Sequence, residues 1–202
     1  MVDLRIKENF KEKNIEVSFF KNLSEAKLQI LKLININDTV GIGHSGTLQA
    51  MDITNELILR GNIVFDKELA KDKEECKVIK KKALLTDWYI TGSNAISFDG
   101  KIVNVDHSGN RVAAINFGPD KVIIVVGQNK ITNNLEEAIS RVKNIACPKN
   151  AKRAGFNPPC VTLNKCVDCK SKERVCNCLS IIEGQVGKDR IKLFIIDDDL
   201  GF

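Results

Sequence analysis

Short apolar runs alternate with longer amphipathic stretches along most of the chain. The runs are rich in β-branched residues and several end at a glycine, which is typical of β-strands. The strongest of them, KVIIVVG at 121–127, is an unbroken apolar run and is predicted to be buried on both faces of a sheet. The predicted strands are 15–20, 39–43, 62–66, 88–92, 101–105, 121–127 and 191–196.

The longer stretches repeat their apolar residues at helical spacing. Leu135, Ala138 and Val142, for example, fall on one side of a predicted helix. Asn22 is a predicted N-cap, and Glu25 stands three residues later, where a capping-box partner belongs. The predicted helices are 3–13, a helix after Asn22, 47–61, 67–85 and 135–146.

Strands that alternate with helices of this length predict a layered α/β fold with a mainly parallel sheet. Residues 147–185 interrupt the alternation, because they hold three prolines and show no helical pattern. We interpret this segment as a small metal-organised insertion before the last strand. With 202 residues, of which 43% are hydrophobic, the chain is predicted to form one domain over 1–202 that includes the segment.

Composition and charge argue against several classes of partner. The net charge is only +5 and aromatic residues make up 5% of the chain, which is unlike a nucleic-acid-binding protein. The basic run KVIKKK at 77–82 is interpreted as a solvated helix face. No apolar run is long enough to cross a bilayer, so no membrane contact is expected. The opening MVDLRIKENF lacks the apolar core of a secretory signal, and we expect a cytoplasmic protein.

Three predicted strands lead into glycine-containing turns, at 41–47, 91–96 and 126–130. Parallel α/β sheets bind ligands at the carboxyl ends of their strands, where glycines let backbone amides approach closely. One such turn is explained by strand termination alone, but three turns with polar residues favour a phosphate or carboxylate site. Neither a Walker loop nor a convincing dinucleotide motif is present. The candidate ligand-binding residues are Gly43, Ser45, Gly46, Thr47, Gly92, Asn94, Asn110 and Lys130.

A fourth polar cluster, VDHSGNR at 105–111, supplies the candidate catalytic residues Asp106 and Arg111. The Arg111 guanidinium could hold a carboxylate or phosphate through two hydrogen bonds. Asp106 could act as a base or could orient Arg111, and a purely structural turn explains the cluster equally well. His44 and His107 are interpreted as ordinary turn residues.

Five of the seven cysteines fall in PCVTLNKCVDCKSKERVCNC at 159–178. In a reducing compartment such a cluster favours metal or redox chemistry over structural disulfides, and the odd total agrees. The spacing C-x5-C-x2-C-x6-C can bring four sulfurs to one metal centre. Neighbouring lysines and an arginine would balance the thiolate charge. The candidate metal ligands are Cys160, Cys166, Cys169 and Cys176.

The spacing leaves the metal open. The sequence has neither the paired knuckles typical of structural zinc sites nor the cysteine run of bacterial ferredoxins. The spacing therefore does not decide between zinc and a [4Fe–4S] cluster. Cys178 could be a spare ligand, a redox thiol or a packed residue, and Cys76 and Cys147 are interpreted as ordinary packing residues.

Several sequence blocks in fixed order resemble the lactate-utilisation (LUD) domain family from about residue 38 onward. They are GIGHSGTL, TDWYITGSNAISFDGKIVNVDHSGNRVAAINFGPDKVIIVVGQNKI, EEAISRVKNIACPKNAKR and PC…CVDCKS…RVCN. The resemblance implies a fold like that of ribose-5-phosphate isomerase and the CoA transferases. It also implies that GIGHSGT is the counterpart of a loop that binds a ligand's phosphate or carboxylate. The isomerases' acidic catalytic motif has no clear match here, so isomerase activity is not implied.

Some members of the family are subunits of an iron–sulfur system that oxidises L-lactate, which favours a [4Fe–4S] cluster over zinc. Three functional hypotheses remain. The first is an iron–sulfur protein acting in or beside the oxidation of lactate or a related small organic acid. The second is a non-redox isomerase- or transferase-like enzyme for a carboxylated or phosphorylated molecule, with a structural zinc. The third is a non-catalytic subunit of an iron–sulfur oxidoreductase. A homodimer is compatible with each of them.

Overall fold

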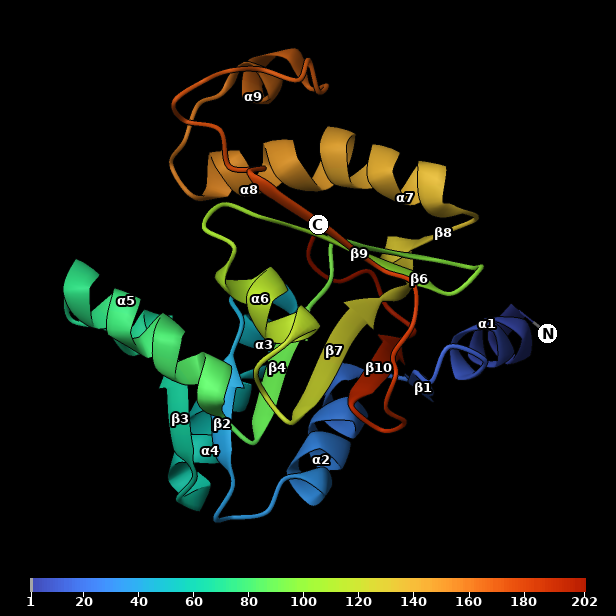
Figure 1. Ribbon diagram of the computed structural model, residues 1–202, viewed down its shortest axis with the longest axis vertical. Helices are drawn as coiled ribbons and strands as arrows, with labels where there is room; N and C mark the ends of the chain where they lie inside the picture. The colour runs from blue at the N-terminus through green and yellow to red at the C-terminus, as the bar shows by residue number, and fades with distance from the viewer. Residues whose placement is uncertain (1) are drawn as a thin grey trace.

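A six-stranded sheet, parallel throughout, forms the centre of the computed structural model, which describes residues 2–202 with side chains from residue 4 (Figure 1). The strand order is β1-β10-β7-β4-β2-β3. The mainly parallel α/β architecture expected from the alternating pattern is therefore confirmed. The strands are β1 (Glu16–Phe20), β2 (Thr39–Ile42), β3 (Ile63–Asp66), β4 (Trp88–Gly92), β7 (Lys121–Gly127) and β10 (Ile191–Ile196).

Strand β7 lies inside this sheet between β10 and β4, and all its residues after Lys121 are buried. Ile123 and Val125 belong to the hydrophobic core on one face, whereas Ile124 and Val126 belong to the core on the other. Alternate side chains of a strand point to opposite faces, so both faces of β7 must be covered. The predicted two-sided burial of this strand is confirmed.

Helices cover both faces of the sheet. Helices α2, α3 and α4 supply the core of one face, and α1 and α6 contribute to the core of the other. Asn22 caps α2 as predicted, since its Oδ1 accepts a hydrogen bond from the Glu25 amide over 3.0 Å. The helices of this part are α1 (Val2–Lys11), α2 (Leu23–Leu33), α3 (Gly46–Met51), α4 (Ile53–Arg60), α5 (Lys73–Lys82) and α6 (Asn110–Asn116).

Two predicted helices are interrupted. The helix expected over 47–61 divides into α3 and α4 at Asp52, whose φ of 54° is left-handed and breaks the helical hydrogen bonding. Gly61, with a φ of 102°, ends α4 as expected. The helix expected over 67–85 is α5 flanked by two short 3-10 turns, η1 (Lys67–Leu69) and η2 (Ala83–Leu85).

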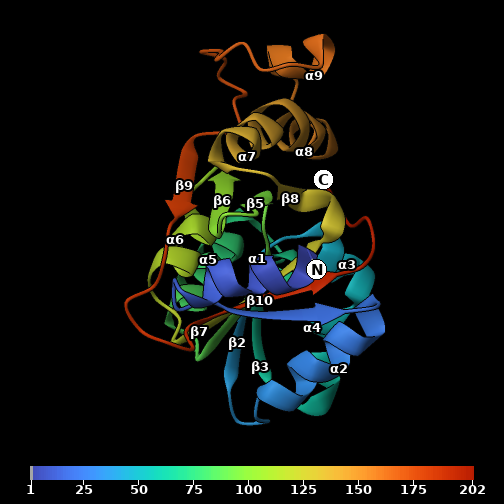
Figure 2. The same ribbon diagram turned by 90° about the vertical axis from the view of Figure 1, so that its right-hand side faces the viewer.

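A second, smaller sheet packs above the large one and carries α7 on its outer side (Figure 2). Its order is β8-β5-β6-β9, and the hairpin predicted across residues 98–100 joins β5 to β6. The sequence pattern did not predict this sheet as a separate layer, because β5 and β8 are too short to show a period. Its strands are β5 (Ala95–Ser97), β6 (Lys101–Asp106), β8 (Ile131–Thr132) and β9 (Cys178–Ile182).

Residues 147–185 contain more regular structure than expected. A π-helix (Val142–Ala146) joins α7 (Leu135–Arg141) to α8 (Cys147–Arg153), and α9 (Pro159–Leu163) and β9 follow. The expectation that this segment has no helix was wrong, because Pro148 lies in the first turn of α8, where a proline is tolerated. Residues 164–177, between α9 and β9, form neither helix nor strand.

No helix in the described part of the chain has the length and apolar character that crossing a bilayer requires.

Candidate functional site

A cleft of about 240 Å³ lies where the strands of the large sheet end. The turns after β2 and β4 line it, together with Lys130 after β7 and the β6–α6 turn. Residues of α8 lie on the opposite side. The structure thus brings together residues that are far apart in the sequence. The sequence-predicted residues that line the cleft are Ser45, Gly46, Gly92, Asn94, Asp106, Asn110, Arg111 and Lys130.

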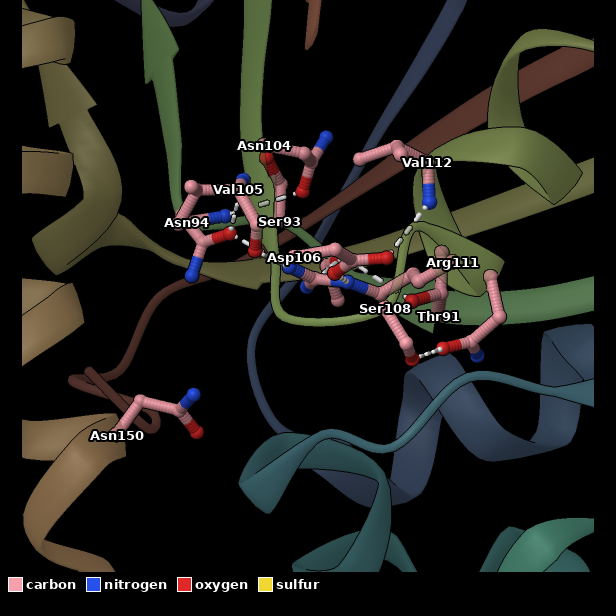
Figure 3. Close-up of polar contacts among 12 residues, drawn as sticks. Thr91, Ser93, Asn94, Asn104, Val105, Asp106, Ser108, Arg111, Val112 and Asn150 are labelled. Carbon is pink, nitrogen blue, oxygen red and sulfur yellow. Dashed lines mark hydrogen bonds and ion pairs between the residues drawn. The ribbon is translucent and has the colours of Figure 1, made fainter. Parts of the chain in front are cut away.

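The cleft carries an excess of positive charge. Its acidic side chain is Asp106, whereas its basic ones are Lys67, Lys80, Arg111, Lys130 and Arg153. Asn150 of α8 lines the cleft as well, opposite the cluster around Arg111 (Figure 3).

Three of the basic residues and Asn150 were missed by sequence reasoning. Lys67 directly follows the predicted strand 62–66, so the strand-end rule could have found it. Asn150 and Arg153 stand three residues apart and share a helix face, but only the tertiary structure turns that face toward the cleft.

Arg111 is held by four hydrogen bonds in the centre of the site (Figure 3). Its Nε donates to Asp106 Oδ1 over 2.9 Å, and its Nη2 donates to Asn94 Oδ1 and to the Val105 carbonyl. Its Nη1 donates to the Gly92 carbonyl over 3.3 Å. A guanidinium has five N–H groups, so one N–H on Nη1 is left for a ligand.

Both carboxylate oxygens of Asp106 accept a hydrogen bond from the protein. Its Oδ1 accepts from Arg111, and its Oδ2 accepts from the Val112 amide over 2.9 Å. Both side chains of the pair are largely buried, with exposed fractions of 9% for Asp106 and 12% for Arg111. This geometry favours an orienting role for Asp106 over a role as a base.

Asn94 connects the two sheets to this pair. Its Oδ1 accepts from the Val105 amide as well as from Arg111. Its side-chain oxygen is therefore occupied, and Nδ2 is the group that it can offer to a bound molecule.

Lys130 lies in η3 (Gln128–Lys130) and is only 4% exposed. Burial, followed by the charges of Arg141 and Arg111, lowers the pKa of Lys130 from 10.5 to about 7. Thr47 is buried beside it, and its hydroxyl has no hydrogen-bond partner within the described residues. A methyl group added to Gly201 would lie 3.2 Å from Lys130 Nζ and 3.3 Å from Thr47 Oγ1, so both polar groups face that position.

Gly43 lies below the cleft, where neighbouring strands pack tightly. A methyl group at Gly43 would lie 2.5 Å from Thr91 Oγ1 and 2.8 Å from Tyr89 Oη. The glycine is therefore required by packing between β2 and β4, independently of any ligand.

His44 links two charged residues at the rim of the cleft. Its Nδ1 lies 3.0 Å from Glu68 Oε1, and its Nε2 contacts the Arg153 guanidinium. Burial, and then the charges of Arg153 and Lys67, lower the pKa of His44. A neutral imidazole can accept from Arg153 at Nε2, which positions Arg153, whereas Nδ1 has no hydrogen-bond partner within the described residues.

The clustered cysteines gather near the start of α8. Burial raises the pKa of the Cys160 thiol, and the nearby thiols of Cys169, Cys176 and Cys166 raise it further. Cys147 joins this group, because burial and the thiol of Cys176 raise its pKa to about 12. Cys178 lies elsewhere, on β9, where its sulfur would be 3.2 Å from a methyl group at Gly109.

The arrangement of these thiols is not that of a closed metal site. All seven cysteines are free, and within residues 2–202 no three His, Cys, Asp or Glu side chains stand where they could share one ion. The chemistry of the donor set nevertheless suits a thiophilic metal. The Asp168 amide donates to Cys166 Sγ over 3.5 Å, and Asn144 Oδ1 accepts from the Cys166 amide. The metal-binding character predicted for this segment is not confirmed.

Fold and site together define an α/β protein with a cationic cleft at the carboxyl ends of parallel strands. The family model of the LUD domain matches residues 4–196, and the chain belongs to the LUD domain family. A crystal structure of a DUF162 family protein from Deinococcus radiodurans has the same fold, with a TM-score of 0.56 and 15% identity over 96% of each chain.

The eIF2B delta subunit from Chaetomium thermophilum is more distant, with a TM-score of 0.38 and 16% identity over 58% of this chain and 50% of that one. No curated protein matches the sequence.

Proposed function

We propose that this LUD-domain protein binds a small anionic organic acid, carboxylated or phosphorylated, in the cleft at the strand ends. The observation that carries the proposal is the charge of the cleft. Five basic side chains line it, and its carboxylate, Asp106, is already paired with Arg111. A bound anion would supply the missing negative charge, and partly buried charged hydrogen bonds are worth more than exposed ones.

The residues of the cleft suggest how the acid would be held. Arg111 is fixed in direction by its four acceptors and presents one N–H, so it would form a single oriented hydrogen bond. Asn94 Nδ2 adds a neutral donor beside it. Arg153 and the two rim lysines, Lys67 and Lys80, would attract the anion from solution.

The finer form of the proposal is a role in or beside oxidation of lactate or a related hydroxy acid. Cys160, Cys166, Cys169 and Cys176 would hold a [4Fe–4S] cluster, which supplies one-electron transfer when it is bound. Two elements support a link to the cleft. Val175 lines the cleft and directly precedes Cys176, and α8 carries both Cys147 and the cleft residue Arg153. With zinc in its place the same thiols would have a structural role, which is the non-redox alternative.

Calorimetric titration tests the cleft. L-Lactate, pyruvate and ribose 5-phosphate are titrated into the full chain, and at least one is expected to bind. Arg153→Gln should weaken that binding about tenfold, which corresponds to about 1.4 kcal/mol for one charged hydrogen bond. Lys152→Gln is the matched control, because it removes the same charge from an exposed neighbour that does not line the cleft. Equal affinities for the two variants would show that the anion binds elsewhere.

A further inference from the structure

Lys130 differs from the other basic residues of the cleft in being buried without a partner. Among the described residues, Lys130 Nζ has no hydrogen-bond acceptor and no carboxylate in an ion pair with it, although the residue is only 4% exposed. The two arginines whose charges act on Lys130 have acceptors of their own. Arg141 donates to the carbonyls of Asn129 and Asn94, and Arg111 takes Asp106.

A buried ammonium without a counter-charge is unfavourable, and two nearby guanidinium groups make it more so. The pKa of Lys130, lowered to about 7 first by burial and then by Arg141 and Arg111, follows from this placement. Near neutral pH about half of these amines would be uncharged, against fewer than about one in a thousand for an ordinary lysine. An uncharged lysine amine is a nucleophile.

Resting on the proposed function of the cleft, we propose that Lys130 captures the carbonyl carbon of a small 2-oxo acid as a reversible imine. The Nζ lone pair forms the C–N bond, and the carbonyl oxygen leaves as water with the two protons that the amine gives up. Hydrolysis of the C=N bond returns the free acid and the free amine. No oxidant or reductant is needed.

The surroundings favour a carbonyl compound that also carries a carboxylate. A protonated imine at Lys130 would meet the same repulsion from Arg111 and Arg141 as the ammonium does. The substrate's own carboxylate, close to the new bond in a 2-oxo acid, would offset it.

The other cleft lysines do not share this placement. Lys67 is half-buried and forms an ion pair with Glu68, whose Oε1 lies 3.1 Å from Lys67 Nζ. Lys80 is also half-buried and extends from α5 at the rim. Either of them can attract an anion, but neither combines burial with the absence of a partner as Lys130 does.

Reductive trapping tests the inference. The full chain is incubated with glyoxylate or pyruvate and sodium cyanoborohydride at pH 7, and the adduct is located by intact mass and peptide mapping. We expect labelling of Lys130 at least about tenfold above that of the surface lysines, because an ordinary lysine amine is almost wholly protonated at pH 7. L-Lactate, which has the carboxylate but no carbonyl, should compete.

Lys130→Arg should abolish this adduct, and Lys152→Arg, a change at an exposed lysine that does not line the cleft, should leave it unchanged. Circular dichroism of both variants establishes that they are folded. Labelling spread evenly over surface lysines, or unaltered in Lys130→Arg, would overturn the inference. So would the absence of any adduct at Lys130.

The titrations of the proposed function separate the two ideas. If pyruvate or lactate binds in an Arg153-dependent way and no adduct forms, the cleft binds acids and Lys130 is only a cation within it. If neither binding nor an adduct is observed, both proposals fail.

Discussion

Arg111 Nε donates to Asp106 Oδ1 over 2.9 Å, and the second oxygen of the same carboxylate accepts from the Val112 amide. The pair therefore joins the end of β6 to the first turn of α6. Both side chains are largely buried, so neither can exchange its partner for water without a rearrangement. This closed pair fixes the direction of the guanidinium at the centre of the cleft.

Asp106→Ala should destabilise the protein by about 3 kcal/mol, because it leaves a buried guanidinium and a buried amide without their acceptor. Asp106→Asn keeps one acceptor and should cost less. Urea denaturation followed by circular dichroism measures both differences. Asp197→Ala removes an exposed carboxylate and is the control, for which no change in midpoint is expected. A midpoint for Asp106→Ala equal to that of the control would contradict a structural role for the pair.

The second prediction concerns the effect of Lys130 on the pH dependence of stability. Its pKa is about 7 in the folded protein and near 10.5 when unfolded, so between these values the unfolded chain binds the additional proton. The contribution of Lys130 to the free energy of unfolding is therefore greatest above pH 10.5 and is lost as the pH falls to 7. Lys130→Met removes this dependence. The advantage of the variant over the wild type should grow by about 1.4 kcal/mol for each pH unit from 10.5 down to 7.

Urea denaturation at pH 7, 8 and 9 measures that difference, with the exposed Lys152→Met as control. Parallel stability profiles for Lys130→Met and the wild type would mean that Lys130 is charged in the folded protein throughout this range.

The third prediction concerns the effect of a side chain at Gly43 on stability. Gly43→Ala places a methyl group 2.5 Å from Thr91 Oγ1 and 2.8 Å from Tyr89 Oη, and both of these side chains are buried. Overpacking of this kind costs about 1–3 kcal/mol. Thermal melting compares it with Gly187→Ala, where a methyl group meets nothing within 4 Å. Melting temperatures that fall equally in the two variants would show that close packing at Gly43 is not the cause.

The features of the fold that the sequence predicted best are those with a strong local period. The buried run 121–127 became β7, and the strand ends at Gly92 and Lys130 did converge on one cleft, because parallel strands place their carboxyl ends at one edge. Features that depend on tertiary contacts were missed. Arg153 lies on an ordinary basic helix face, which only the tertiary structure turns toward the cleft. Cys147 does pack in a hydrophobic core, as expected, but its closeness to the Cys176 thiol could not be predicted. The low pKa of Lys130 follows from burial, which no local pattern reveals.

The cysteine cluster makes the last prediction. Protein purified without oxygen should carry metal bound to Cys160, Cys166, Cys169 and Cys176, and Cys166→Ser should lose most of it. A metal that binds only the folded chain stabilises it by about 4 kcal/mol when its free concentration exceeds Kd a thousandfold, so the variant should also melt earlier. Cys76→Ser is the matched control, since Cys76 lies in α5, outside the cluster.

Metal analysis and visible absorption provide the readout. Iron with sulfide supports the [4Fe–4S] cluster, whereas a colourless protein with zinc supports the structural alternative. Metal content and melting temperature that are unchanged in Cys166→Ser would show that the four thiols are not the ligands.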